Sequence, residues 1–81
     1  MFKERHWQRT HANGWKAIVV QTDADWYRGY AQDARGQRIE PHREGTHFGT
    51  TRDAADRDVL TRAPHDCGCA NWAEVQERVS R

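Results

Sequence analysis

GWKAIVVQTDADWYRGY, residues 14–30, is the one stretch of this chain in which large apolar side chains run together. Its first half is rich in β-branched residues and too short for a convincing helix, which predicts a strand. Along that strand, Ile18 and Val20 would lie on one face, with Ala17 and Val19 on the other. Two apolar faces predict a central strand that is covered on both sides.

The chain after this strand continues as a meander. A second strand is predicted at residues 26–32, because a turn rich in Asp separates two runs of β-forming residues. Within it, Gly29 indicates a bulge or a close approach by another backbone. A third, short strand is predicted at residues 37–40 and would end at Pro41. Residues 15–40 are therefore predicted to form an antiparallel β-meander.

The N-terminal segment, residues 1–13, has two interpretations. His6, Gln8 and Thr10 alternate with Trp7, Arg9 and His11, and Asn13-Gly14 is a turn signal, so residues 5–11 would pair with 15–21 as an additional edge strand. The alternative is a loose basic arm. The sheet is thus predicted to have three strands, or four if this segment pairs.

Two helices are predicted after the meander. The first covers residues 51–63, because Thr50 and Asp53 are spaced like a capping box and Pro64 stops the helix. Its buried stripe would comprise Ala55, Val59, Leu60 and Ala63. The second covers residues 71–80, with Asn71 as its cap. Its narrow apolar stripe would comprise Trp72, Val75 and Val79.

The fold class predicted from this order is α+β, a small antiparallel meander packed by two C-terminal helices. Residues 1–81 are expected to form a single domain. Only ten of the 81 residues are Leu, Ile, Val or Phe, the net charge is +1, and four Trp and two Tyr supply bulk. Because a core this thin contributes only about 3–5 kcal/mol, help from a metal, a dimer interface or a larger partner is expected.

The sequence also bounds the setting of the protein. It has no run approaching the ~18 apolar residues of a membrane helix, and no apolar leader segment is found at its start. Its two cysteines fit a reducing compartment better than a disulfide scaffold. A cytoplasmic protein with no membrane partner is therefore expected.

A His/Cys cluster is the strongest constellation of chemically active residues. Cys67 and Cys69 could supply two thiolates from one turn, and His65 a third ligand. A fourth ligand for a structural zinc would come from His42 or His47 in the earlier loop. The alternatives are a redox pair and two thiols that bind nothing.

Catalysis is the less favoured class of function. Cys67 has His65 and Asp66 beside it, but residues adjacent on a linker rarely orient one another as a triad requires. A chain of 81 residues also leaves little room for a substrate pocket of a few hundred Å³. We therefore expect a binding protein, with no catalytic residues assigned.

Aromatic and charged side chains are the candidates for partner binding. Aromatics beside arginines are typical of protein hot spots and can also stack bases and neutralise phosphate. An acidic helix face could in addition imitate phosphate spacing toward a basic partner. The candidates are Trp26, Tyr27, Arg28, Tyr30, Arg35, Arg38, Arg43, Asp53, Asp56 and Asp58.

The function predicted from these features is docking on a macromolecular partner. A nucleic-acid-processing protein complex is the expected partner, with the chain acting as an accessory or inhibitor of the phage or mobile-element type. The alternatives are a module that binds nucleic acid directly and a domain stabilised by zinc through the His/Cys cluster. The sequence leaves the oligomeric state open.

Overall fold

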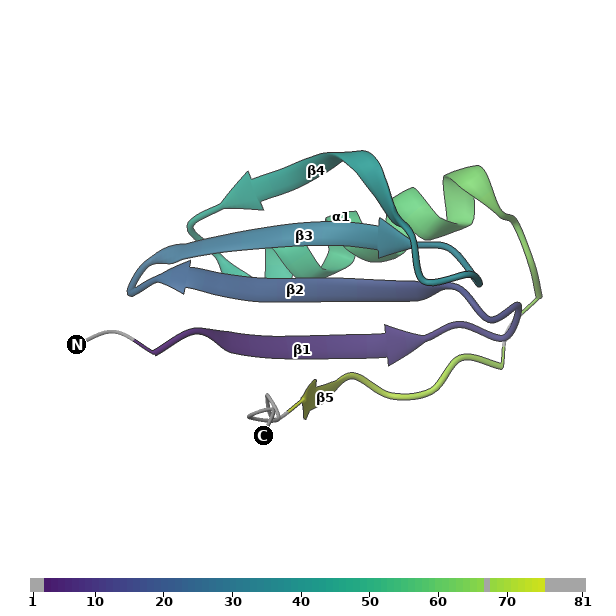
Figure 1. Cartoon of the computed structure of the whole chain (residues 1–81), viewed down its shortest axis with the longest axis horizontal. Helices are drawn as coiled ribbons and strands as arrows, with labels where there is room; N and C mark the ends of the chain where they lie inside the picture. Colours follow the sequence, from purple (N-terminus) through teal and green to yellow (C-terminus); the bar gives the residue numbers. More distant parts are fainter. Residues whose placement is uncertain (1–2, 67, 76–81) are drawn as a thin grey trace.

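The computed structural model of the protein describes residues 3–66 and 68–75 (Figure 1). Within these residues the chain forms a small α+β fold, in which one helix packs on an antiparallel sheet of five strands. The elements follow in the order β1 (Arg5–Thr10), β2 (Lys16–Asp23), β3 (Trp26–Gln32), β4 (Arg38–Gly45), α1 (Phe48–Arg62) and β5 (Ala73–Val75). The strand order in the sheet is β4-β3-β2-β1-β5.

Strand β2 is the central strand, and both of its faces are buried as predicted, but among the described residues only one face is covered by another element, α1. Ala17 and Val19 are fully buried beneath α1, while Ile18 and Val20 are buried on the opposite face. Strand β1 pairs with β2 in antiparallel register, with Trp7 opposite Val19. The N-terminal segment therefore contributes a strand to the sheet.

The helix lies close against the sheet because small residues line the contact. Ala17, Ala31, Ala55 and Val59 form the buried cluster between them. A Cβ atom at Gly29 would lie 3.0 Å from both Cγ2 and the backbone oxygen of Thr51. Gly29 thus marks a close approach, and the β3–β4 register also shifts between Gly29 and Ala31.

The helix differs in its bounds and in its buried face from the prediction. It begins at Phe48, and His47 is the N-cap without a side-chain cap hydrogen bond. Thr51 instead donates its hydroxyl hydrogen to the backbone oxygen of His47, 2.9 Å away. The predicted buried stripe is wrong at Leu60, which is 44% exposed. The residues of α1 that are buried are Thr51, Ala55 and Val59.

The strand predicted to end at Pro41 is longer. Strand β4 continues through Pro41 to Gly45. It lies at the edge of the sheet, where a missing backbone N–H is tolerated, and the irregular register with β3 falls in the same region. The predicted limit of three or four strands is corrected to five among the described residues.

The first residues of the second predicted helix, 71–75, are not helical. Residues 73–75 form β5, which pairs with the outer edge of β1, so that Trp7 lies opposite Glu74. Arg5 donates two hydrogen bonds of 2.9 Å to the carboxylate of Glu74 across this pair. Backbone pairing with an open edge outweighs the weak helical preference of three residues. The rest of the predicted helix, residues 76–80, lies outside the described residues.

Candidate functional site

The face of the sheet that lies opposite α1 is covered by no other helix or strand of the described residues (Figure 1). We call it the open face. Ile18, Val20 and Tyr30 form a small apolar cluster on it, and each is at most 8% exposed. Since no element covers these three residues, their burial comes from longer neighbouring side chains. The guanidinium of Arg38 lies 4.5 Å from the centre of the Tyr30 ring, and the His42 ring lies 5.6 Å from it.

A hydrogen-bonded network centred on Glu44 lies at the β3–β4 side of the open face. The indole N–H of Trp26 donates to one carboxylate oxygen at 2.7 Å, and Nε2 of His42 lies 2.7 Å from the other. Nδ1 of His42 lies 3.1 Å from the carboxylate of Glu40. These two carboxylates, Glu44 first, raise the pKa of His42 above its ordinary value. The indole N–H and then His42 lower the pKa of Glu44.

Arg28 lies beside this network with an unsatisfied donor. Its Nε atom is inaccessible to solvent and has no hydrogen-bond partner among the described residues. The nearest carboxylate oxygen, on Glu44, is 3.8 Å away, too long for a hydrogen bond. A buried charged donor without an acceptor is costly, and a small shift of Glu44 or an acceptor from outside would satisfy it.

The candidate partner-binding residues are divided between the two faces of the sheet. Trp26, Arg28, Tyr30 and Arg38 belong to the open face, and Arg35 lies in the exposed turn that precedes β4. Tyr27 lies on the helix side, where its ring centre is 5.7 Å from that of Phe48. Arg43 also points to the helix side, where it bonds to Asp58.

The three candidate carboxylates of the helix do not form one exposed row. Asp53 is exposed and lies 3.5 Å from Nε of Arg52. Asp58 pairs with Arg43. Asp56 is directed inward and is only 15% exposed. Asp56 and Asp58 are therefore engaged by basic side chains of this chain, and Asp53 is the exposed member of the three.

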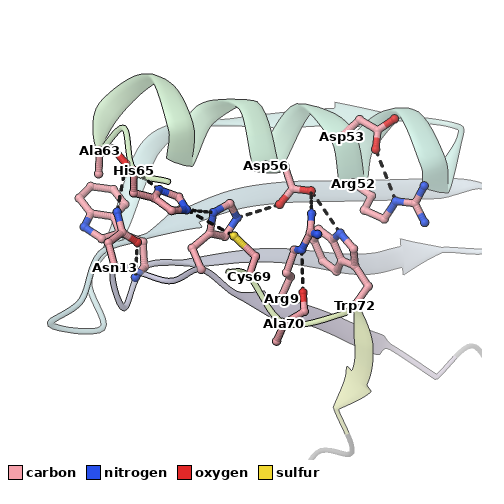
Figure 2. A network of polar contacts seen from close by, with 12 residues as sticks. Arg9, Asn13, Arg52, Asp53, Asp56, Ala63, His65, Cys69, Ala70 and Trp72 are labelled. Carbon is pink, nitrogen blue, oxygen red and sulfur yellow. Dashed lines mark hydrogen bonds and ion pairs between the residues drawn. The ribbon is translucent and has the colours of Figure 1, made fainter. Parts of the chain in front are cut away.

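Asp56 holds together a second polar cluster, on the helix side of the sheet (Figure 2). One of its oxygens lies 2.9 Å from Nε2 of His11, and the other accepts hydrogen bonds from Arg9 at 2.9 Å and from the Trp72 indole at 3.2 Å. The His11 side chain is 1% exposed. His11 extends this cluster to His65.

His11, His65 and Cys69 are brought together from three parts of the chain. Nδ1 of His11 lies 3.2 Å from Nε2 of His65, which lies 3.3 Å from the sulfur of Cys69. All three ligand atoms lie within 4.8 Å of one another. The contact with Cys69, and then the Ala63 carbonyl, raise the pKa of His65, while the contact with His65 lowers the pKa of the Cys69 thiol.

The predicted metal-ligating residues are thus only partly assembled. His65 and Cys69 meet, but the group of convergent ligand atoms in the described residues contains neither His42 nor His47. His42 is engaged by Glu40 and Glu44 on the open face, and His47 occupies the N-cap position of α1 without a side-chain cap hydrogen bond. Cys67 lies outside the described residues.

His11 is the ligand-type residue that the sequence analysis did not assign. The signal that could have identified it is the hairpin register. Because residues 5–11 pair with 15–21, His11 lies at the end of the hairpin where α1 also ends. The chain after α1 must pass this end, carrying His65 and Cys69 with it.

Comparison of the chain with protein-family models, with curated proteins and with solved structures finds no match. In the part of the chain that the structure describes, no helix has the length and apolar character needed to cross a membrane. The function of this chain is therefore inferred from the two clusters themselves.

Proposed function

We propose that this chain is a non-catalytic binding domain that docks on a protein partner through the open face of its sheet. The observation that carries the proposal is the arrangement of Trp26, Arg28 and Arg38 around the apolar cluster of Ile18, Val20 and Tyr30, on a face that no helix or strand of the described residues covers. Trp, Tyr and Arg are the residues that dominate the binding energy of protein interfaces. The cytoplasmic setting expected from the sequence is part of this proposal.

The distribution of charge favours a protein over a nucleic acid. Glu40 and Glu44 stand on the open face beside its arginines, and they would repel a phosphate backbone. The ring of Tyr30 already carries the guanidinium of Arg38, so it offers less surface for stacking a base. The net charge of the whole chain is only +1.

One end of the open face is nonetheless basic, and it indicates the chemistry of the partner. Lys16 and Arg38 both lie opposite Gln32, in one row across the sheet. Arg35 lies in the neighbouring turn. A partner surface with carboxylates facing this end of the open face would complement this arrangement. The expected class of partner is a nucleic-acid-processing complex. We propose that the component of that complex on which this chain docks is a protein with such a surface.

The experiment is a cross-linking capture from nuclease-treated lysate that compares the wild type with face variants. Trp26→Ala and Arg38→Glu change the open face, and Arg57→Glu is the matched control, because Arg57 is exposed on α1. A protein captured by the wild type and by Arg57→Glu, and lost with both face variants, supports the proposal. With the purified partner, each face variant is expected to weaken binding at least about 30-fold, as for a hot-spot residue worth about 2 kcal/mol.

Direct binding of nucleic acid is the competing outcome. Fluorescence polarisation with labelled single-stranded and double-stranded DNA should show no saturable binding. If affinity is measurable, falls steeply between about 50 mM and about 200 mM salt, and is lost in Arg38→Glu, the basic row is a phosphate-binding surface. That result, or capture that disappears after nuclease treatment, would overturn the proposal of a protein partner.

A further inference from the structure

We infer that Nδ1 of His11, Nε2 of His65 and Sγ of Cys69 are three ligands of a zinc site whose fourth position faces solvent, with Asp56 as a positioning residue. The inference does not rest on the proposed docking function, because the cluster lies on the opposite side of the sheet from the open face. Imidazole nitrogen and thiolate sulfur are the ligands that zinc prefers in proteins.

The two short distances between the ligand atoms fit a tetrahedral ion. With Zn–N of about 2.0–2.1 Å and Zn–S of about 2.3 Å, two nitrogen ligands lie about 3.3 Å apart and a nitrogen and a sulfur about 3.6 Å apart. The observed separations are 3.2 Å from His11 Nδ1 to His65 Nε2 and 3.3 Å from His65 Nε2 to Cys69 Sγ. These two pairs need move apart by only a few tenths of an ångström to accept the ion, and the third pair, Nδ1 of His11 and Sγ of Cys69, lies within 4.8 Å.

In each histidine, the hydrogen bond of the non-ligating nitrogen determines whether the ligating nitrogen carries a hydrogen or a lone pair. Nε2 of His11 lies 2.9 Å from a carboxylate oxygen of Asp56, and Nδ1 of His65 lies 3.1 Å from the backbone oxygen of Ala63. Both oxygens are acceptors, so both of these nitrogens carry the hydrogen. When both rings are neutral, the lone pairs on Nδ1 of His11 and Nε2 of His65 therefore point at each other. A cation between the two nitrogens would bind both lone pairs. A carboxylate or carbonyl behind the ligating histidine is the usual outer contact of a zinc site.

The backbone around the site is held by contacts of its own. The amide of Ala70 donates to the Thr10 carbonyl at 2.9 Å, and Arg9 donates to the Ala70 carbonyl at 2.8 Å. Asn13 donates its side-chain amide to the Ala63 carbonyl at 3.0 Å. These bonds fix the segment after α1 against the β1–β2 turn. The ligands are thereby positioned before any ion binds.

The site opens on one side into a hollow of about 400 Å³, so the expectation that so short a chain has little room for a pocket of a few hundred Å³ is wrong. Its lining includes the three ligand residues together with Arg9, Asp56 and Leu60. A three-ligand site beside a hollow leaves the fourth tetrahedral position to water. Zinc would also link β1, the end of α1 and the segment before β5, which supplies stability to a domain with a thin core.

The alternative is a proton in place of the ion. In that case His65 is an imidazolium shared between His11 and a Cys69 thiolate, and the cluster binds no metal. The two alternatives differ in metal content and in spectrum. They can therefore be separated without a functional assay.

The first experiment measures metal in the full chain, purified under reducing conditions without added metal. We expect close to one zinc per chain. After removal of zinc with a chelator, titration with Co²⁺ should produce the intense visible bands of tetrahedral cobalt and a near-ultraviolet thiolate-to-cobalt band. Zinc far below one per chain, together with the weak spectrum of six-coordinate cobalt, would overturn the inference. A different metal at full occupancy would overturn the choice of zinc.

The second experiment assigns the ligands. Cys69→Ser should abolish the thiolate-to-cobalt band, and His65→Gln should abolish stoichiometric zinc binding. Asp56→Asn keeps all three ligands, so we expect the cobalt spectrum to remain while zinc affinity falls about 10–100-fold. His42→Gln is the control and should bind as the wild type does. Circular dichroism of each metal-free variant shows whether it is folded. A folded Cys69→Ser chain that binds zinc with wild-type affinity would refute the site.

Discussion

The carboxylate of Asp56 lies 2.9 Å from Nε2 of His11, and this contact joins the middle of α1 to the residue that follows β1. The same carboxylate accepts hydrogen bonds from Arg9 and from Trp72. Two other segments of the chain therefore converge on this one acidic group of α1, which is only 15% exposed. A charge so placed is stabilising only while its partners remain, because desolvation of an unpaired ion is costly.

Replacing Asp56 is expected to destabilise the protein strongly. Asp56→Ala leaves the donors of Arg9, His11 and Trp72 without their acceptor, and we expect a loss of about 2–3 kcal/mol in the free energy of unfolding, somewhat below the cost at a fully buried pair. Urea unfolding followed by tryptophan fluorescence measures the change. Asp53→Ala is the control, since Asp53 is exposed, and should change stability by less than about 0.5 kcal/mol. Equal losses in the two variants would contradict this account of Asp56.

Adding a side chain at Gly29 is expected to destabilise the protein. A Cβ atom there would lie 3.0 Å from both Cγ2 and the carbonyl oxygen of Thr51, so the helix would have to move away from the sheet. We expect Gly29→Ala to cost about 1–3 kcal/mol in thermal or urea unfolding, the range for overpacking. Gly49→Ala is the matched control, because nothing lies within 4 Å of its Cβ position. It should be neutral or stabilising by up to about 1 kcal/mol, and a loss there similar to that of Gly29→Ala would argue against close packing as the cause.

The central strands could be predicted from the sequence because their signal is local. Ile18, Val19 and Val20 are consecutive and β-branched, and a strand is the element in which both of their faces can be buried. Gly29 within the next strand indicated a close approach, which α1 makes. The α+β class follows from these strands and from the helix before Pro64.

The C-terminal segment could not be predicted in the same way. Asn71, Trp72 and Val75 have the spacing of a short helix, but residues 73–75 pair with β1, and the open edge of β1 is a long-range feature. The continuation of β4 past Pro41 could not be predicted either, because it also depends on a long-range feature. Proline is tolerated there only because the strand lies at an edge of the sheet, and strand order is not visible in local sequence.

The His/Cys cluster was identified from the sequence in part, through the proximity of His65 and Cys69 along the chain. The third member, His11, is 54 residues from His65, and only the hairpin register and the course of α1 bring the two together. The candidate His42 was misleading for a physical reason, because two glutamates on its own strand engage it. Spacing along the chain identifies ligands within one turn but not across the fold.

His42 is expected to make stability depend on pH. Glu44 and then Glu40 raise its pKa above the ordinary value of about 6.5, against the opposing effects of burial and then of Arg28. The stabilisation from protonated His42 is therefore complete below about pH 6.5 and is lost as the pH rises through the higher pKa of the folded state. Relative to His42→Gln, the wild type should be more stable at pH 6 than at pH 8 in urea unfolding. The NMR titration midpoint of His42 should lie above 6.5 and should fall in Glu44→Gln, and a midpoint at or below 6.5 in the wild type would contradict the prediction.

Val59 and Leu60 distinguish the observed packing of α1 from the packing expected from sequence periodicity. Val59 is fully buried between helix and sheet, whereas Leu60 is 44% exposed although it is the larger apolar residue. Val59→Ala removes two buried methyl groups and leaves a cavity, so we expect a loss of about 2–3 kcal/mol in the free energy of unfolding. Leu60→Ala should cost less than about 1 kcal/mol, because much of its side chain already contacts water. Both values come from urea unfolding monitored by circular dichroism. A larger loss in Leu60→Ala than in Val59→Ala would mean that the helix is rotated about its axis, with the face predicted from sequence toward the sheet.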